Sequence, residues 1–276
     1  MSEPASYSTT IENWRRAMDE KLRAENGWLA LAGLFWLHEG HNRFGADPSN
    51  DIVLPPGSAP DYVGSFEFHA GQTQLHVAAG QVVTVNGERV TEAPLQPDSS
   101  STPSIVELGD LTLVVLQRGT RYAIRVRDKN SLARKAFPRR RWFPIQEAYR
   151  VSGTFIPYNP PKPMSLMTVL GYPEDRASPG YVEFTLIGTV ARLDALPTVS
   201  GELFLIFSDQ TAGTLTYPAG RYLYTPRPVD GAVTLDFNKA YNPPCAFTPF
   251  ATCALPPPQN RLPFRIEAGE LYEDKT

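Results

Sequence analysis

Proline and glycine interrupt this chain so often that long regular elements have little room. The 276 residues include 27 prolines and 20 glycines, which fall between short runs of alternating or apolar residues. Proline and glycine mark turns, and short alternating runs between turns are typical of β-strands. The pattern therefore predicts a mainly β protein, with an N-terminal helix, a β-sandwich and then a second antiparallel β-sandwich or barrel.

An amphipathic helix is expected at the start of the chain. Apolar residues recur at three- and four-residue steps over residues 9–25, and Thr9 with Glu12 forms a capping-box pattern. The apolar run at 28–37 fits either a buried strand or a short second helix, because its periodicity favours neither. This run is too short to cross a bilayer.

The stretch from residue 82 to residue 90 carries a strong hairpin signal. Its Asn86-Gly87 pair suits a type I′ turn, which needs positive φ at both central residues. Together with the upstream order Asn50-Asp51-Ile52-Val53-Leu54, this stretch resembles forkhead-associated (FHA) domains, which are β-sandwiches that bind phosphothreonine peptides. FHA domains usually begin the first motif with Gly-Arg and continue with Ser-x-x-His, and neither feature occurs here. The resemblance therefore implies an FHA-like fold, and phosphopeptide binding is not expected.

Changes in pattern divide the chain into four expected parts. These are a helical and apolar segment at 1–41, a β-sandwich at 42–128, a basic linker at 129–148 and a C-terminal antiparallel β domain at 149–276. The basic residues that precede Trp142 form either a solvated face or an anion-binding lip, because guanidinium groups match carboxylates and phosphates. Beyond the linker, the prolines between 157 and 163 predict a turn.

An irregular segment at 235–253 interrupts the strand pattern near the end of the chain. It holds both cysteines, Cys245 and Cys253, and is rich in proline, asparagine and aromatic residues. Ordering such a segment costs about 1 to 2 kcal/mol per residue. The segment is therefore expected either to close a sheet as a packed loop or to form the wall of a pocket.

The same segment carries a family resemblance. The run Asp-Phe-Asn-Lys-Ala-Tyr-Asn-Pro-Pro-Cys-Ala-Phe-Thr-Pro begins at Asp236, and Gly220-Arg221-Tyr222-Leu223 and Asn260-Arg261-Leu262-Pro263 flank it. These strings resemble the bacterial and archaeal domain-of-unknown-function family DUF1684. The resemblance extends to residues 27–37 and 124–128, and so over nearly the whole chain. The family has no established activity, so the resemblance implies no catalytic residues.

The sequence lacks the usual signatures of nucleotide, metal and hydrolase sites. It contains no P-loop, no Gly-x-Gly-x-x-Gly fingerprint and no Gly-x-Ser-x-Gly elbow. All four histidines lie in the first 76 residues, so a Cys-His or Ser-His site would need both halves of the chain. His38 and His41 do not have the His-Glu-x-x-His spacing, and the cysteines lack a Cys-x-x-Cys pairing. We therefore expect no metal, no cofactor and two reduced or buried thiols.

A polar set is expected to come together around the irregular segment. Asp236 and Asp209 are the candidate general acids or bases. The candidate ligand-binding residues are Arg221, Asn238, Tyr241, Asn242, Asn260, Arg261, Arg141 and Trp142. The alternative is a structural ion pair between Asp236 and either Arg221 or Arg261, and the sequence leaves both interpretations open.

Three functions fit these residues. The first is binding of a small polar or anionic ligand in the C-terminal half, the second is a histidine-independent hydrolase or isomerase that uses Asp236 or Asp209, and the third is a protein-interaction scaffold built on the N-terminal sandwich. The net charge of −3 gives no general attraction to nucleic acid or membrane, so neither is an expected partner, whereas a protein partner stays open. No signal-peptide pattern is present, and a cytoplasmic protein is expected.

Overall fold

The chain divides into two compact units. The computed structural model describes residues 6–273. One unit, here called the terminal unit, contains Met1–Glu20 and Pro138–Thr276, and the other, here called the inserted unit, contains Lys21–Phe137. The inserted unit therefore interrupts the sequence of the terminal unit.

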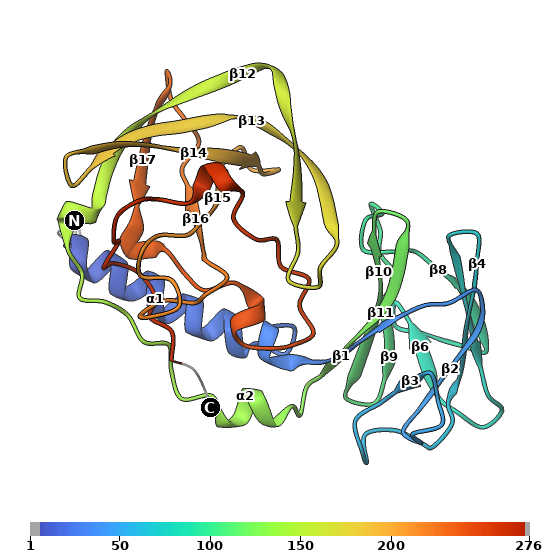
Figure 1. Cartoon of the computed structure of the whole chain (residues 1–276). Coiled ribbons are helices and arrows are strands. Elements are labelled where there is room, and N and C mark those ends of the chain that lie inside the picture. Colours follow the sequence, from blue (N-terminus) through green and yellow to red (C-terminus); the bar gives the residue numbers. More distant parts are fainter. Residues whose placement is uncertain (1–5, 274–276) are drawn as a thin grey trace, which may run out of the picture. The chain divides into compact units, whose positions relative to one another are not determined.

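The inserted unit is a sandwich of two β-sheets. One sheet has the strand order β1-β11-β10-β9-β6-β7 and the other has the order β3-β2-β4-β5-β8, and Figure 1 shows the two sheets facing each other. The strands are β1 (Leu31–Trp36), β2 (Gly40–Gly45), β3 (Ile52–Val53), β4 (Gly64–His69), β5 (Gln72–Val77), β6 (Val83–Val85), β7 (Glu88–Val90), β8 (Glu92–Leu95), β9 (Val106–Leu108), β10 (Leu111–Arg118) and β11 (Arg121–Asp128). Apolar residues from both sheets, such as Phe66 and Val126, form its buried core.

Local signals in this unit behave as the sequence predicted. The hairpin between β6 and β7 turns at Asn86 and Gly87, which have φ values of 52° and 85°. The ambiguous run at 28–37 begins with the 3₁₀ turn η1 (Trp28–Ala30) and continues as β1, which pairs with β11. A short helix α2 (Leu132–Ala136) ends the unit.

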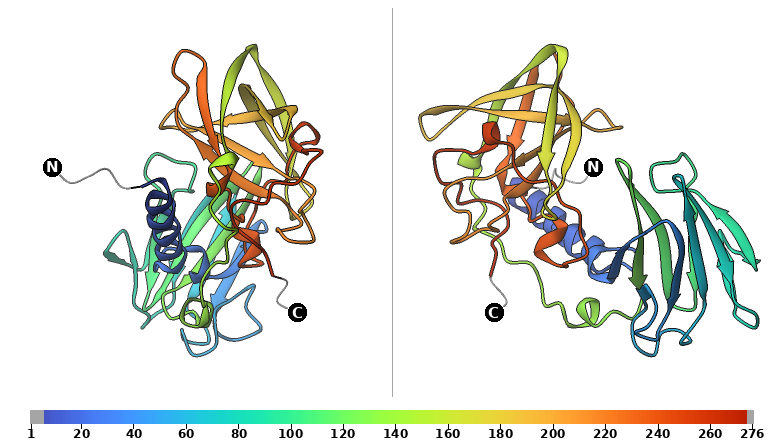
Figure 2. Two further views of the ribbon diagram at one scale, coloured as in Figure 1. Left: turned by 90° about the vertical axis from the view of Figure 1, so that its left-hand side faces the viewer. Right: turned by 45° about the vertical axis from the view of Figure 1, so that its right-hand side comes forward.

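The terminal unit is a curled antiparallel sheet of six strands. Its strand order is β16-β15-β14-β13-β12-β17, and the sheet bends into a half-barrel (Figure 1, Figure 2). The strands are β12 (Arg150–Met167), β13 (Pro173–Leu186), β14 (Thr189–Pro197), β15 (Leu203–Phe207), β16 (Arg221–Thr225) and β17 (Ala232–Asp236). The short helices are η2 (Glu147–Tyr149), η3 (Phe237–Lys239), η4 (Pro244–Ala246) and η5 (Pro258–Asn260).

Irregular chain fills the core side of this curled sheet. Phe237, Leu262 and Ile266 are buried in the same apolar cluster as Val182 of β13 and Leu205 of β15. Burial of apolar side chains offsets the entropy lost in ordering chain that has no regular backbone pairing. Within the segment 235–253, Phe237 and Ala240 are thus packed in the core of the sheet.

The proline-rich stretch in β12 corrects one expectation. Residues 157–163 were predicted as a turn, yet they lie within β12. The pairing of β12 with β13 shifts between Pro157 and Lys162, and β17 pairs only with residues 150–154 of β12. The prolines are tolerated because they stand where the strand needs few backbone donors.

The helix α1 (Tyr7–Arg23) forms near its predicted range. It begins two residues earlier than the range that starts at Thr9, because Ser6 acts as the cap, and its Oγ accepts from the Thr9 backbone N–H at 3.2 Å. The capping box of Thr9 with Glu12 is therefore not used. Within residues 6–273, no helix is long and apolar enough to cross a membrane.

Candidate functional site

Asp209 and Arg221 form a buried ion pair. Asp209 follows β15 and Arg221 begins β16, and an Arg221 Nη2 atom lies 2.6 Å from Asp209 Oδ2. Both side chains are only 1% exposed. Burial lowers the pKa of the Arg221 guanidinium, and the neighbouring Asp209 carboxylate opposes this effect.

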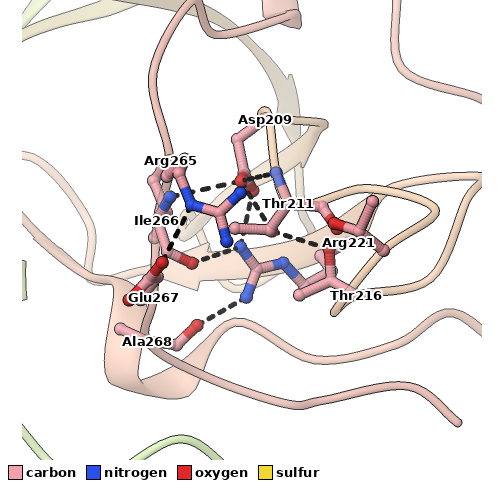
Figure 3. A network of polar contacts seen from close by, with 9 residues as sticks. Asp209, Thr211, Thr216, Arg221, Arg265, Ile266, Glu267 and Ala268 are labelled. Atoms are coloured by element: carbon pink, nitrogen blue, oxygen red, sulfur yellow. Dashed lines mark hydrogen bonds and ion pairs between the residues drawn. The ribbon is translucent and has the colours of Figure 1, made fainter.

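This pair fastens the end of the chain to the sheet. Arg221 also donates to the backbone carbonyls of Ile266 and Ala268, as Figure 3 shows. Asp209 Oδ1 accepts from the backbone N–H and hydroxyl of Thr211 and from the N–H of Ile266, at 2.7 to 3.2 Å. Both oxygens of Asp209 are thus occupied by protein donors, and the contacts hold irregular backbone that has few partners of its own.

Asp236 lies in a second network, with α1. The Tyr7 hydroxyl donates to Asp236 Oδ1 at 2.8 Å, and the Asn238 backbone N–H donates to the same oxygen at 3.2 Å. Burial raises the pKa of the Tyr7 hydroxyl, and Asp236 adds to this increase. Asn238 is fully buried and also bonds both the N–H and the carbonyl of Gln146. This network connects α1, the end of β17 and the chain that leads into β12.

Trp142 and Tyr241 lie in a third group, around Trp14 of α1. The Trp14 ring centroid is 5.6 Å from that of Trp142 and 6.5 Å from that of Tyr241. Such spacings are typical of packed aromatic rings in a core. Tyr241 is buried and Trp142 is half-buried. The Trp14 ring thus contacts both segments that were predicted to contribute ligand-binding residues.

Asn242 lies beside a buried carboxylate. Its backbone N–H donates to Glu270 Oε2 at 2.8 Å, and Arg140 donates to the same oxygen at 3.0 Å. Burial raises the pKa of Glu270 to about 7, although Arg140 acts in the opposite direction. Glu270 was not among the candidates, because its position in the sequence gives no sign that it is buried.

The remaining candidates have different surroundings. Asn260 is buried and bonds the backbone of Asp194 and Ile206, which ties β14 to β15. Arg261 is exposed, and Arg141 is exposed and ion-paired with Glu273. The ten predicted side chains therefore belong to several networks, and none of them lines the cavity described next.

The terminal unit has a cavity of about 460 Å³ that the candidate residues did not indicate. Strands β12 to β15 and the loop before β17 surround it, with Phe155 and Leu203 as apolar lining. Its polar residues are Thr198, Glu202 and Arg227. No local signal could have found this cavity, because the order of strands in the sheet decides which turns meet.

Gly201 brings Arg227 close to the cavity wall. Gly201 has a φ of 82°, and a Cβ atom there would lie 3.2 Å from Arg227 Cδ. Arg227 is exposed, and no carboxylate within residues 6–273 forms an ion pair with it. Its guanidinium group is thus available at the cavity.

Another polar cluster lies on the sheet itself. The Asp194 carboxylate, 1% exposed, accepts from the Tyr158 hydroxyl and from Lys162 Nζ, both at 2.7 Å. Burial raises the pKa of Tyr158 to about 12, and the Asp194 carboxylate adds to this increase. Since each Asp194 oxygen has a donor, the cluster joins β12 to β14. Sequence reasoning missed it because strand pairing alone brings these residues together.

The cysteines are free thiols that lie close together. The Cys245 backbone N–H donates to Cys253 Sγ at 3.2 Å. The Cys253 thiol lowers the pKa of Cys245 through a hydrogen bond. In the described part of the chain, no group of three or more His, Cys, Asp or Glu residues could hold a metal ion.

Residues 135–271 match the model of a family described as "Protein of unknown function (DUF1684)". This part of the chain, residues 135–271, belongs to the family. The match does not reach residues 27–37 and 124–128, to which the sequence resemblance was expected to extend. A DUF1684 assignment brings no catalytic residue with it, and no curated protein matches the chain.

Three solved structures are similar to parts of this DUF1684 chain. An uncharacterized protein of Haloarcula marismortui, solved in solution, is 31% identical over 52% of this chain and 81% of that one, with a TM-score of 0.43. The FHA domain of FhaA, solved in complex with an intracellular domain, is 19% identical over 34% of this chain and 97% of that one, with a TM-score of 0.25. The FHA-2 domain of a Mycobacterium tuberculosis ABC transporter is 28% identical over 32% of this chain and 76% of that one, with a TM-score of 0.25. The two facing sheets resemble an FHA-like sandwich, as the sequence predicted.

Proposed function

We propose that the terminal unit binds a small molecule with an apolar body and a single anionic group, such as a carboxylate. The observation that carries this proposal is the cavity of about 460 Å³ beside Arg227. Its volume lies in the range of about 300 to 1,000 Å³ that is usual for small-molecule sites. Phe155 and Leu203 offer the apolar surface that such a body needs.

The two charged residues at the cavity favour one anionic group over several. Arg227 offers a planar fork of donors that matches a carboxylate. Glu202 is exposed at the same cavity, and its Oε2 accepts from Ser200 Oγ at 2.8 Å. A second anionic group would meet the negative charge of Glu202, so a polyanion fits this cavity less well.

Proline gives the cavity stiff walls. Four of the lining residues are Pro157, Pro179, Pro197 and Pro228. Because the proline ring fixes φ, these walls lose little conformational freedom when a ligand binds. Such preorganisation supports binding of a ligand without a large rearrangement.

A thermal-shift screen against small aromatic and aliphatic carboxylates tests this proposal. A ligand at about 100 times its dissociation constant stabilises the native state by roughly 2.7 kcal/mol, which a melting curve resolves. We expect the stabilisation to be lost in Arg227→Gln and kept in Arg261→Gln, which also removes one exposed arginine from the terminal unit. A shift that is equal in both variants, or no shift with any carboxylate, contradicts the proposal.

A second candidate is hydrolase or isomerase chemistry at Asp236. The observation that favours it is the Tyr7 hydroxyl 2.8 Å from the Asp236 carboxylate, since such a pair can move a proton. Asp209 is less suited to this role, because protein donors occupy both of its oxygens. If a screen of ester and amide substrates detects turnover, Asp236→Asn should abolish it in folded protein. Unchanged turnover in that variant removes Asp236 from the role.

A further inference from the structure

The inserted unit has a groove of about 660 Å³ beside β10 and β11. Three basic residues line it, namely Arg125, Arg127 and Lys129. The residues between them on β11 face the other way, since Val126 is fully buried in the sandwich core. The groove therefore lies on the face of this sheet that points away from the core.

The strand sets the spacing of the three basic residues. Successive residues of a β-strand alternate between its two faces, so residues two apart lie about 7 Å from each other on one face. Arg125 and Arg127 belong to β11, and Lys129 continues the alternation directly after the strand ends. The groove therefore has a row of basic residues at regular steps.

Arg127 has a buried polar group that no protein atom in the described part of the chain satisfies. It is half-buried, and within residues 6–273 its Nε atom has no hydrogen-bond partner. Burial lowers the pKa of its guanidinium group, since desolvation disfavours the charged form. An anionic group placed beside Arg127 would supply the missing partner and oppose this cost.

We propose that this groove binds an extended acidic segment of a partner protein, with carboxylates at every second residue. An extended peptide places alternate side chains on one face at steps of about 7 Å, which equals the spacing of the basic row. Each carboxylate then lies opposite one cation, and every contact is a charge-assisted hydrogen bond. Pro103 and Ile105, the latter 46% exposed, give the segment an apolar wall.

The lining favours a peptide over a single strand of nucleic acid. Proteins that bind single strands combine basic grooves with aromatic side chains on which bases stack, and among residues 6–273 no aromatic residue lines this groove. Glu25 and Asp98 also line it, and they would repel a continuous row of phosphates. A peptide can place neutral residues beside them. Asp98 is already ion-paired with Arg118 at 2.9 Å.

Fluorescence anisotropy with labelled peptides and the full chain tests the proposal. The first probe is a peptide in which glutamate and valine alternate, the second has the same composition with the glutamates in one block, and the third is an oligothymidine. We expect the alternating peptide to bind most tightly and Arg127→Gln to weaken it about tenfold, as the loss of one charge-assisted hydrogen bond predicts. Lys129→Gln should weaken it in the same direction.

A matched control separates this row from general charge. Arg89 is exposed on β7 of the same unit, so Arg89→Gln removes the same charge elsewhere and should leave binding unchanged. Three results overturn the proposal. These are equal binding of the two peptides, equal loss in the Arg89 and Lys129 variants, and tighter binding of oligothymidine than of the alternating peptide.

Discussion

The buried pair of Asp209 and Arg221 gives the sharpest prediction at the scale of single residues. Removing one partner of a buried ion pair leaves the other charge uncompensated, which costs about 3 to 5 kcal/mol. We therefore expect Asp209→Asn to lower the free energy of unfolding by this amount in urea denaturation. Its control is Glu267→Gln, which breaks the pair with Arg265 drawn in the same network of Figure 3.

That control pair differs from the buried pair in its exposure to solvent. The side chains of Arg265 and Glu267 are 45% and 46% exposed, and exposed pairs contribute about 1 kcal/mol or less. If the two variants lose the same free energy of unfolding, the contribution of Asp209 to stability does not depend on its burial. The comparison would then count against a structural role for the Asp209 network.

Glu270 predicts a pH dependence of stability. Its pKa in the folded protein is about 7, above the ordinary value of 4.5, chiefly because it is buried. Between these values the folded state holds a proton that the unfolded state has released, so stability decreases as the pH rises through this window. The largest possible loss is about 3 kcal/mol, at about 1.4 kcal/mol for each pH unit.

The variant Glu270→Gln removes this titration. We expect its free energy of unfolding, measured in urea at pH 5 and pH 8, to change less between the two values than that of the parent. The absolute stability of the variant is not the readout, because Arg140 loses the nearer of its charged partners, Glu270, and keeps Asp19 at 3.6 Å. If the free energy of unfolding depends on pH equally in the parent and the variant, Glu270 is not the group that causes the pH dependence.

At the scale of elements, the turn before β16 depends on glycine more strongly than a neighbouring turn does. Gly213 and Gly220 have φ values of 78° and 86°. A Cβ atom at Gly213 would meet open space, whereas one at Gly220 would lie 2.5 Å from the Phe207 carbonyl oxygen and 2.5 Å from Pro256 Cγ. Alanine at either site carries the backbone cost of positive φ, about 1 to 2 kcal/mol.

Only Gly220→Ala should carry a steric cost in addition. Crowding in a packed interior adds about 1 to 3 kcal/mol, so we expect the Gly220 variant to be clearly less stable than the Gly213 variant in thermal denaturation. The test is which of the two variants has the lower melting temperature. A Gly213 variant that is as unstable as the Gly220 variant would show that backbone conformation alone sets the cost.

The elements that could be predicted from sequence are those with local causes. The helix α1 follows from its apolar period and the β6 to β7 turn from Asn86-Gly87, since both depend on residues close in sequence. The curl of the six-stranded sheet has no such local cause. It depends on pairing of β17 with β12, which are far apart in sequence. Residues 157–163 were taken for a turn because proline marks turns locally, whereas pairing with β13 keeps their ends in a strand.

At the scale of the whole molecule, one cause explains why the candidate polar residues were hard to interpret. Irregular chain leaves backbone N–H and carbonyl groups without regular partners, and side chains must satisfy them. Asn238 does so for Gln146, and Asn260, itself in irregular chain, bonds backbone groups of Asp194 in β14 and Ile206 in β15. A loop that closes a sheet thus selects the residue types that a binding site also uses. The sequence could identify these residue types, yet their partners come from distant parts of the chain and decide which network each residue joins.

The position of α1 leads to a prediction for the entire chain. Residues 7–20 belong to the terminal unit although residues 21–137 separate them from the rest of it. Ile11 is fully buried, Trp14 packs on Trp142 and Tyr241, and Tyr7 bonds Asp236. Deletion of residues 1–20 removes all these contacts at once, and burial of one large apolar side chain alone contributes about 1.5 to 3 kcal/mol.

Hydrogen exchange can locate the effect of this deletion. We expect amide exchange to accelerate more in residues 138–273 than in residues 31–128, because no residue of the described range 6–20 belongs to the apolar core of the inserted unit. The control is Arg16→Gln, which changes an exposed residue of α1 and should leave the amide exchange rates of both regions unchanged. Equal acceleration in the two regions would mean that α1 stabilises both units alike. Acceleration confined to residues 138–273 would show that the chain completes its C-terminal β-sheet with its own N-terminal helix.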